Sequence, residues 1–437
     1  MHNSEKCSTF AQNFKHMIDS RTLETILLDQ KNELEAREQE TLCHRPEEAL
    51  VEINSPQAQV VIGVRRSGKS TMCYQALKQR GVHFAYADFD DERLKGLQAE
   101  QLNDVLEVLY KIYGDFQYLF LDEIQDIDGW HLFVNRMLRQ KMHVIITGSN
   151  AKLLSGELAT HLTGRNKEIA LYPFSFQEFC YMKGVDTKSV ATKQTAFRRT
   201  AFDEYMQQGG FPELLIIEDK RHYINTLVDN ILKRDIEQRY KIVYKAAFEQ
   251  MAHHLLNISP SIVATQEITD LFHFKSLHTT KNYIDYLKQA YLLAGVPKFA
   301  TKSKLRTVQE KLYAVDVAMM NMRENAFSPE NLGWRLETIV LIQLLRKCKL
   351  NGWDICYLKE RSGECDFLVC QGNQVLQCIQ VSYDISTEKS RNRELNGLKT
   401  AAQVTKCNNL LLLTDHTYED TTHEGLDIKI RPVHEWQ

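Results

Sequence analysis

The fold is decided by Gly63-Val64-Arg65-Arg66-Ser67-Gly68-Lys69-Ser70, a stretch that directly follows the expected strand at residues 59–62. It satisfies the Walker A pattern, in which two glycines enclose four residues and are followed by a lysine and a hydroxyl residue. The glycines let the loop wrap with unusual dihedral angles, so that backbone N–H groups and the next helix N-terminus can face phosphate oxygens. The stretch therefore predicts a strand, a phosphate-binding loop and a helix.

The side chains of this loop indicate how a nucleotide would be held. Lys69 would neutralise the β and γ phosphates, and Ser70 would give a hydroxyl oxygen to Mg²⁺, a hard cation that prefers oxygen ligands. A pattern this short also occurs by chance, so an ordinary glycine-containing turn is the alternative. The predicted nucleotide-binding residues are Gly63, Val64, Arg65, Arg66, Ser67, Gly68, Lys69, Ser70 and Thr71.

A second motif, Tyr118-Leu119-Phe120-Leu121-Asp122-Glu123, is an apolar run that ends in two carboxylates, which is the Walker B form. We expect Asp122 to hold Mg²⁺, directly or through water, and Glu123 to orient and polarise the attacking water. Alone, such a pair could be a solvated strand end. Together the two motifs predict that the chain binds ATP or another nucleoside triphosphate with Mg²⁺ and hydrolyses it.

The pattern around these motifs predicts the fold class. Short apolar runs alternate with amphipathic helical stretches, as a parallel sheet covered on both faces requires. The predicted strands contain residues 60–62, 84–87, 118–121, 144–146 and 169–171. We therefore predict an α/β protein with a P-loop NTPase sheet. Its predicted parts are a helical leader at 1–50, the P-loop core at 51–175, a helical connector or lid at 176–244, a winged helix at 245–325 and a mixed α/β domain at 326–437.

Composition limits the other classes of function. With 437 residues, 43% hydrophobic and 25% charged, the chain reads as a folded protein of two or three domains. Its net charge of -3 means that any nucleic-acid contact must come from a local basic face. The N-terminus shows no export signal, and the longest apolar runs fall short of the roughly 20 residues that cross a bilayer. We expect a cytoplasmic protein with reduced cysteines and no membrane contact.

Further segments resemble a bacterial and archaeal family of AAA-type ATPases that carry a C-terminal restriction-endonuclease-like domain. The segments are Gly63-Val64-Arg65-Arg66, Asp122-Glu123-Ile124-Gln125 with Gly129-Trp130, Thr147-Gly148-Ser149-Asn150, Leu162-Thr163-Gly164-Arg165 and Pro173-Phe174-Ser175-Phe176-Gln177-Glu178-Phe179. The resemblance extends from about residue 24 to 430. It implies an ATPase core followed by a winged helix, and it favours adenine over guanine.

The resemblance also implies roles for single residues. Ser149 or Asn150, with Asn150 preferred, would fill the sensor 1 position that places the hydrolytic water; the alternative is a polar turn. Arg165 would be an arginine finger, which a neighbouring subunit usually provides, so a homo-oligomer is implied; the alternative is a surface or core-pairing arginine. Arg65 and Arg66 would contact nucleotide or cap neighbouring elements. We identify no second sensor arginine.

Residues 277–289 look like the recognition helix of the winged helix, with His278, Lys281 and Lys288 among apolar positions. Phosphate contacts by such lysines predict salt-sensitive binding of double-stranded DNA. A protein-binding or structural module is the alternative. The wing would add Lys298, Lys302, Lys304 and Arg306.

The last domain resembles a restriction-endonuclease core, which needs a helix Glu, a strand Asp and a Glu-x-Lys on the next strand. Glu337 and Asp366 match, but Gln380-Val381-Ser382 stands at the third place. A neutral amide binds Mg²⁺ weakly and the lysine is missing, so we expect a degenerate fold. The leading hypothesis is a Mg²⁺-dependent ATPase that repositions the winged helix and the last domain. The alternatives are a nucleotide-regulated DNA-binding protein and a Mg²⁺-dependent nuclease.

Overall fold

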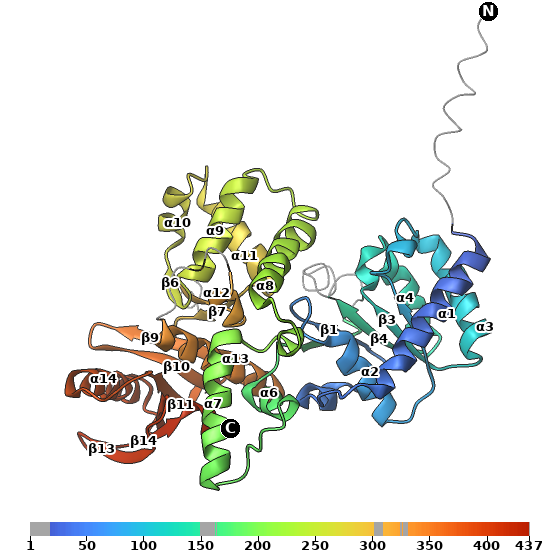
Figure 1. Cartoon of the computed structure of the whole chain (residues 1–437). Coiled ribbons are helices and arrows are strands. Elements are labelled where there is room, and N and C mark those ends of the chain that lie inside the picture. Colours follow the sequence, from blue (N-terminus) through green and yellow to red (C-terminus); the bar gives the residue numbers. More distant parts are fainter. Residues whose placement is uncertain are drawn as a thin grey trace, which may run out of the picture. The chain divides into compact units, whose positions relative to one another are not determined.

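The computed structural model describes residues 18–148, 162, 164–300, 309–323, 326 and 331–436 (Figure 1). Contacts divide the chain into two compact units. The first contains Met1–Ile62 and Lys69–Ala170, and the second contains Gly63–Gly68 and Leu171–Gln437. The loop Gly63–Gly68 therefore groups with the second unit, although the elements before and after it in the chain belong to the first.

Within its described residues, the first unit forms a five-stranded sheet of order β2-β3-β4-β1-β5 in which every pairing is parallel. The strands are β1 (Ala58–Ile62), β2 (Phe84–Asp88), β3 (Tyr118–Asp122), β4 (His143–Gly148) and β5 (Asn166–Ala170). The helices are α1 (Ser20–Ala36), α2 (Lys69–Gln79), α3 (Leu102–Tyr113) and α4 (Trp130–Arg139), with short 3₁₀ turns η1 (Arg37–Gln39), η2 (Pro46–Leu50), η3 (Glu92–Leu94), η4 (Ala99–Gln101) and η5 (Ile124–Asp126). The predicted P-loop NTPase fold is confirmed.

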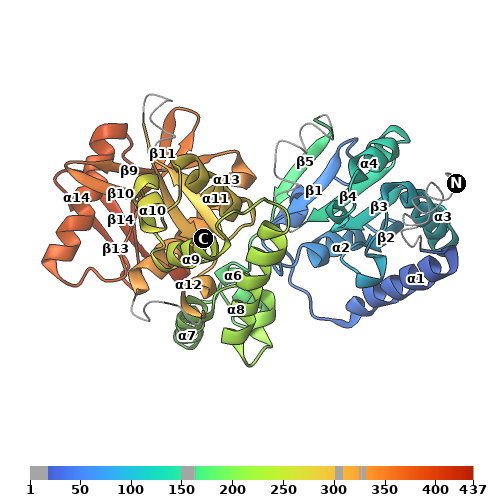
Figure 2. The same cartoon turned by 90° about the horizontal axis from the view of Figure 1, so that it is seen from above.

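Helices cover both faces of this sheet because its crossovers run in both directions (Figure 2). From β1 the chain crosses through α2 to the far strand β2, and then returns through α3 and α4 to β3 and β4. Right-handed crossovers therefore place α2 on one face and α3 and α4 on the other. The leader helix α1 packs beside α3 and β2, where the Gln30 side chain donates to the Asp88 carbonyl at 2.9 Å.

The second unit continues with helices that connect to its later parts. They are α6 (Phe176–Met182), α7 (Thr192–Gln208), η6 (Pro212–Leu215), α8 (Lys220–Asn230) and a π-helical segment, η7 (Ile231–Glu237). The break at Gly209-Gly210, between α7 and η6, is tightly packed: a Cβ on Gly210 would lie 2.1 Å from the Phe174 carbonyl oxygen. The buried Asp316 carboxylate accepts from the N–H of Gly210 at 2.9 Å and of Ala318 at 2.8 Å. This carboxylate fixes the break to the following part of the unit.

The next part covers most of the stretch predicted as a winged helix, and it contains helices and three strands. The elements are α9 (Lys245–Asn257), β6 (Ser261–Val263), α10 (Thr265–Leu271), α11 (Leu277–Gln289), β7 (Leu293–Pro297), β8 (Glu310–Ala314) and α12 (Ala318–Asn321). Over the described residues, the strands form an antiparallel sheet of order β6-β8-β7. The name winged helix stays a prediction for this arrangement.

The last part is a mixed sheet that, in its described residues, has six strands of order β13-β14-β12-β11-β10-β9. Alternate residues of β10 face opposite sides: Phe367 and Val369 join the core with α13, and Leu368 and Cys370 join the core with α14. The restriction-endonuclease-like assignment stays a prediction. The elements are α13 (Leu332–Asn351), β9 (Asp354–Glu360), β10 (Gly363–Gln371), β11 (Gln374–Val381), α14 (Glu388–Thr405), β12 (Leu410–Thr414), β13 (Glu419–His423), β14 (Leu426–Pro432) and η9 (Val433–Glu435).

Among the residues that the structure describes, no helix is both long enough and apolar enough to cross a membrane. The cysteines of the described residues are all buried, and none of them forms a disulfide. They therefore behave as small core side chains.

Candidate functional site

The carboxyl edge of the first unit's sheet, where its parallel strands end, gathers the residues of both motifs. Asp122 ends β3 and Lys69 begins α2. The Lys69 ammonium lies 3.9 Å from a carboxylate oxygen of Glu123, and both side chains are largely buried. The Ser70 hydroxyl bonds to the Asp122 carboxylate. The sequence-predicted Lys69, Ser70, Asp122 and Glu123 thus lie together.

The Asp122 carboxylate is buried and hydrogen-bonded. It accepts from the Tyr86 hydroxyl at 3.2 Å and from the Thr147 hydroxyl. Burial raises the pKa of Asp122, and the neighbouring Glu123 charge raises it further, against the opposing effect of the Ser70 and Thr147 hydrogen bonds. A cation beside this carboxylate would stabilise its ionised form. Carboxylate and hydroxyl oxygens are also the ligand types that suit Mg²⁺.

Glu123 has an unusual backbone that its neighbours hold. Its φ of 52° lies in the left-handed region, which costs a non-glycine residue energy and persists only where the surroundings impose it. The Glu123 N–H donates to the Thr147 carbonyl at 3.1 Å, and the Gln125 side chain donates to the Glu123 carboxylate. Thr147 and Gln125 therefore fix the direction of the carboxylate that would orient water.

Sequence reasoning assigned no role to Asp88 or Thr147, although both lie at this edge. Asp88 ends β2 and is paired in register with Asp122. Burial, together with the charge of Asp122, raises the pKa of Asp88 to about 8. The sequence offered one signal for Asp88: it is an Asp at the end of a predicted strand, and the carboxyl ends of parallel strands share one edge of the sheet. Thr147 ends the apolar run of β4 in the same way.

The loop between β1 and α2 is wrapped as the motif requires. Gly63, Arg66 and Gly68 have φ angles of 151°, 68° and 91°. A Cβ on Gly63 would lie 2.0 Å from the Leu171 carbonyl oxygen, so only glycine fits there.

The two loop arginines bind carboxylates of the connecting helices. The Arg65 guanidinium donates to Asp235 at 3.2 and 3.4 Å, and the Arg66 guanidinium donates to Glu213 at 2.9 Å. Asp235 is 1% exposed and lies on η7, whereas Glu213 lies on η6 and is partly exposed. The sequence left two roles open for these arginines, contact with nucleotide and capping of neighbouring elements. The structure shows hydrogen bonds to neighbouring elements.

Comparison with known proteins gives the family. The chain is 31% identical over 436 residues to the uncharacterized protein MJ1544 of Methanocaldococcus jannaschii, and the match covers 96% of each chain. The chain belongs to the family of this archaeal protein. Within that family, an uncharacterized protein of Haemophilus influenzae is 29% identical over 387 residues, which cover 84% of this chain and 92% of the relative.

Two family models match parts of the chain. Residues 55–180 match an AAA domain, and residues 199–330 match a domain of unknown function, DUF8612. The AAA domain agrees with the P-loop sheet and supports ATP binding. Both matches end before α13, so the restriction-endonuclease-like character of the last domain is not confirmed.

Two solved structures align with lower similarity. One is the replication initiator DnaA bound to AMPPCP and single-stranded DNA, with 16% identity, coverage of 55% of this chain and 85% of that chain, and a TM-score of 0.26. The Holliday junction branch migration motor RuvB of Thermotoga maritima has 15% identity, coverage of 63% and 89%, and a TM-score of 0.27. At these TM-scores the likeness adds nothing to what the AAA domain itself shows.

Three further predictions for the AAA domain concern Ser149, Asn150 and Arg165. Ser149 and Asn150 lie outside the described residues, so the sensor 1 position stays a prediction. Arg165 is exposed and precedes β5, and its carbonyl oxygen accepts from the N–H of Ala58, the first residue of β1, at 2.9 Å. It therefore lies at the amino edge of the sheet, where the strands begin. Five strand residues, roughly 16 Å at ~3.3 Å per residue, separate the two edges.

The predicted DNA-contacting residues differ in availability. His278 and Lys281 on α11 are exposed. Lys288 is bound instead: its ammonium lies 2.6 Å from Glu310 and 3.7 Å from Asp285. Lys298 is half-buried, and Lys302, Lys304 and Arg306 lie outside the described residues.

The last domain brings its three predicted positions together around one cavity. Glu337 on α13, Asp366 on β10 and Gln380 on β11 line a cavity of about 770 Å³. Sequence reasoning found no lysine for this place. The structure brings one from β8, because the Lys311 ammonium lies 2.8 Å from Glu337 and 3.1 Å from Asp366. No local pattern could have revealed it, since Lys311 and Asp366 are 55 residues apart.

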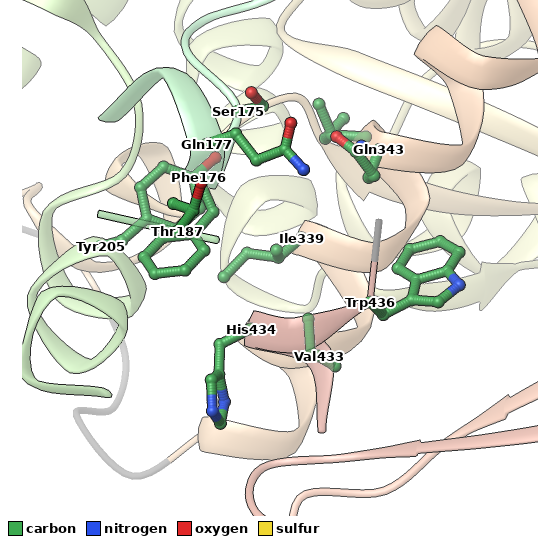
Figure 3. A pocket seen from close by; sticks show the side chains of 11 residues that line it. Ser175, Phe176, Gln177, Thr187, Tyr205, Ile339, Gln343, Val433, His434 and Trp436 are labelled. Atoms are coloured by element: carbon green, nitrogen blue, oxygen red, sulfur yellow. The ribbon is translucent and has the colours of Figure 1, made fainter. Parts of the chain in front are cut away.

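A smaller cavity adjoins the segment 173–179 that the family resemblance singled out (Figure 3). Phe176 and Tyr205 from the connector, Ile339 from α13 and Trp436 near the C-terminus line it. Its volume of about 30 Å³ holds roughly one water molecule, far below the ~300 Å³ at which small-molecule sites begin. The cavity is a packing gap between the connector and the last domain.

Proposed function

We propose that this protein is a Mg²⁺-dependent ATPase that acts as a nucleotide-driven switch. The observation that supports it is the meeting of Lys69, Ser70, Asp122 and Glu123 at the carboxyl edge of the AAA domain's sheet. Lys69 would bind phosphate, and Ser70 with Asp122 would hold the metal. When bound, Mg²⁺ supplies positive charge that offsets the negative charge developing on the transferred phosphoryl group.

Glu123 is our candidate for the residue that orients water. Its carboxylate is held by Gln125 and by the backbone contact with Thr147, so it is positioned before substrate arrives. A positioned carboxylate of this kind accelerates proton transfer by about 10²–10⁴-fold. Tyr86 and Thr147 would keep Asp122 in place beside it.

The switch would work through the loop arginines. Arg65 binds Asp235 on η7, and Tyr240, just beyond η7, stacks on Tyr286 of α11 with ring centroids 3.8 Å apart. The Tyr240 hydroxyl also donates to Gln289 of α11 at 2.8 Å. π-Helical segments such as η7 are rare and occur frequently at functional sites. A change in the loop on nucleotide binding would therefore reach α11 through η7.

A second connection runs from Arg66. Its partner Glu213 lies three residues after Gly210, whose N–H donates to Asp316 just after β8. The loop is thus tied to both sides of the predicted winged helix, at α11 and at β8. With two such connections, nucleotide binding would move the predicted winged helix as a whole.

The coupling is tested with Asp235→Asn in the full-length protein, measured by amide hydrogen exchange with and without ATP and Mg²⁺. In the wild type, ATP is expected to slow exchange in η7 and α11. The variant keeps the shape of Asp235 but lacks the charge that holds Arg65, so it is expected to bind ATP with unchanged affinity while α11 no longer responds.

Asp229→Asn is the matched control, because Asp229 lies on the neighbouring α8 and its exposed carboxylate lies 3.9 Å from the Lys233 ammonium. This control should respond to ATP as the wild type does. An ATP response in α11 that survives Asp235→Asn would contradict the coupling, and a wild type without affinity for ATP would remove the proposed function itself.

Binding of double-stranded DNA is the second candidate function, supported by the exposed His278 and Lys281 on α11. Lys281→Ala is expected to weaken binding of a mixed-sequence duplex and to reduce the slope of log affinity against log salt by about one, as loss of one phosphate contact does. Lys288→Ala should change both less, because Lys288 is already paired with Glu310. Fluorescence anisotropy at several salt concentrations measures the affinity and its salt dependence. Equal affinity of the wild type, Lys281→Ala and Lys288→Ala would rule out this role of α11.

A further inference from the structure

Three carboxylates that line the cavity of the last domain contact a positive charge that comes from a different sheet. Lys311 lies on β8, and its ammonium is 2.8 Å from Glu337, 3.1 Å from Asp366 and 3.2 Å from Glu364. The Lys311 side chain is 8% exposed and that of Asp366 is 7% exposed. Each of the three carboxylates directs one oxygen at the same buried ammonium.

The carboxylate oxygens have further donors. The Tyr313 hydroxyl donates to Glu337 at 2.6 Å, to the same oxygen that Lys311 binds. Lys311 and Tyr313 are two residues apart on β8, so both side chains leave the strand on the same face. The Val381 N–H donates to the other oxygen of Asp366 at 3.0 Å. Both oxygens of Asp366 are thus engaged within the protein.

The third predicted metal-ligand position is engaged as well. The Gln380 side-chain oxygen accepts from the Asp366 N–H at 3.2 Å, and its amide nitrogen donates to Glu394 at 2.7 Å. Arg393 binds the other oxygen of Glu394 at 2.8 Å. The amide therefore links two elements of the domain, β10 and α14.

The divalent metal that a restriction-endonuclease-like core implies does not fit these residues. Mg²⁺ needs oxygens at about 2.0–2.1 Å, and one oxygen each of Glu337, Glu364 and Asp366 already contacts the ammonium. Two cations about 3 Å apart would repel strongly in a buried site. We propose that Lys311 is an internal cation that closes this carboxylate site to divalent metal ions and holds β8 against the last domain. The inference is independent of the proposed ATPase activity.

Removal of the lysine should create a metal site, which Mn²⁺ detects by electron paramagnetic resonance in the full-length protein without nucleotide. Lys311→Ala is expected to bind one more Mn²⁺ than the wild type, and Lys311→Ala/Asp366→Asn is expected to lose it. Lys359→Ala is the control: this exposed lysine lies 3.4 Å from Glu364 on the outer side, so its removal should open no site.

Several outcomes would overturn the proposal. A folded Lys311→Ala, verified by circular dichroism, that gains no Mn²⁺ site would do so. Mn²⁺ binding by the wild type that is lost in Asp366→Asn would also do so, and this measurement needs no lysine variant. Finally, cleavage of plasmid DNA by the wild type with Mn²⁺, abolished by Asp366→Asn and by Lys311→Met, would make Lys311 a catalytic residue instead of a closing cation.

Discussion

Glu123→Gln is expected to bind ATP as tightly as the wild type and to release phosphate about 100-fold more slowly or worse. The amide has the size of the carboxylate and can keep the contact with Gln125, but it cannot accept a proton from the attacking water. Because Lys69, Ser70 and Asp122 are unchanged, the binding of Mg²⁺ and phosphate should persist. Single-turnover phosphate release measures the first effect, and titration with a fluorescent ATP analogue measures the second.

Lys69→Ala provides the contrast, since it removes the ammonium that would contact the phosphates and should abolish binding and turnover together. Glu107→Gln, on the exposed face of α3, should change neither. The assignment of Glu123 fails if Glu123→Gln releases phosphate at the wild-type rate, or if it loses ATP affinity to the same extent as Lys69→Ala.

Glu178→Ala is expected to lower the free energy of unfolding by about 3–5 kcal/mol, because it removes the carboxylate of a buried ion pair while the arginine charge stays buried. The Glu178 carboxylate accepts from the Arg346 guanidinium at 2.6 and 2.7 Å, and both side chains are 5% exposed. The same carboxylate accepts from the Ser175 N–H at 2.6 Å and so caps α6. One substitution therefore removes a buried ion pair and the carboxylate half of the capping box of α6.

Urea unfolding followed by circular dichroism measures this loss. Asp229→Ala is the comparison within the same unit, where an exposed pair with Lys233 should contribute less than about 1 kcal/mol. A loss for Glu178→Ala no larger than that for Asp229→Ala would show that the buried pair does not stabilise the unit as argued.

Local motifs made part of this molecule predictable. The strand, loop and helix at residues 58–79 and the acidic end of β3 follow from residues adjacent in sequence, and α11 was expected at its observed bounds. The short strand β6 was missed because three residues give too weak a pattern. Its partner β8 lies about 50 residues further along the chain, beyond any local signal.

The residues of the candidate site also fall into two groups, those that local motifs predict and those that depend on tertiary structure. Lys69, Ser70, Asp122 and Glu123 are set by two short motifs, whereas the contributions of Asp88 and Thr147 depend on strand register. The position of Lys311 beside Asp366 depends on how two sheets pack against each other. The hydrogen bonds of Arg65 and Arg66 depend on where the connector folds. Tertiary placement of this kind is not encoded in residue spacing.

The position of Arg165 constrains how copies of this chain could cooperate. Because it precedes β5, it lies a full strand length from the edge where Asp122 and Glu123 lie in the same domain. An arginine placed there can assist hydrolysis only in a neighbour. Any assembly that uses it consequently brings the amino edge of the sheet in one copy towards the carboxyl edge of the sheet in another, so two different regions of the same domain surface meet at each shared site.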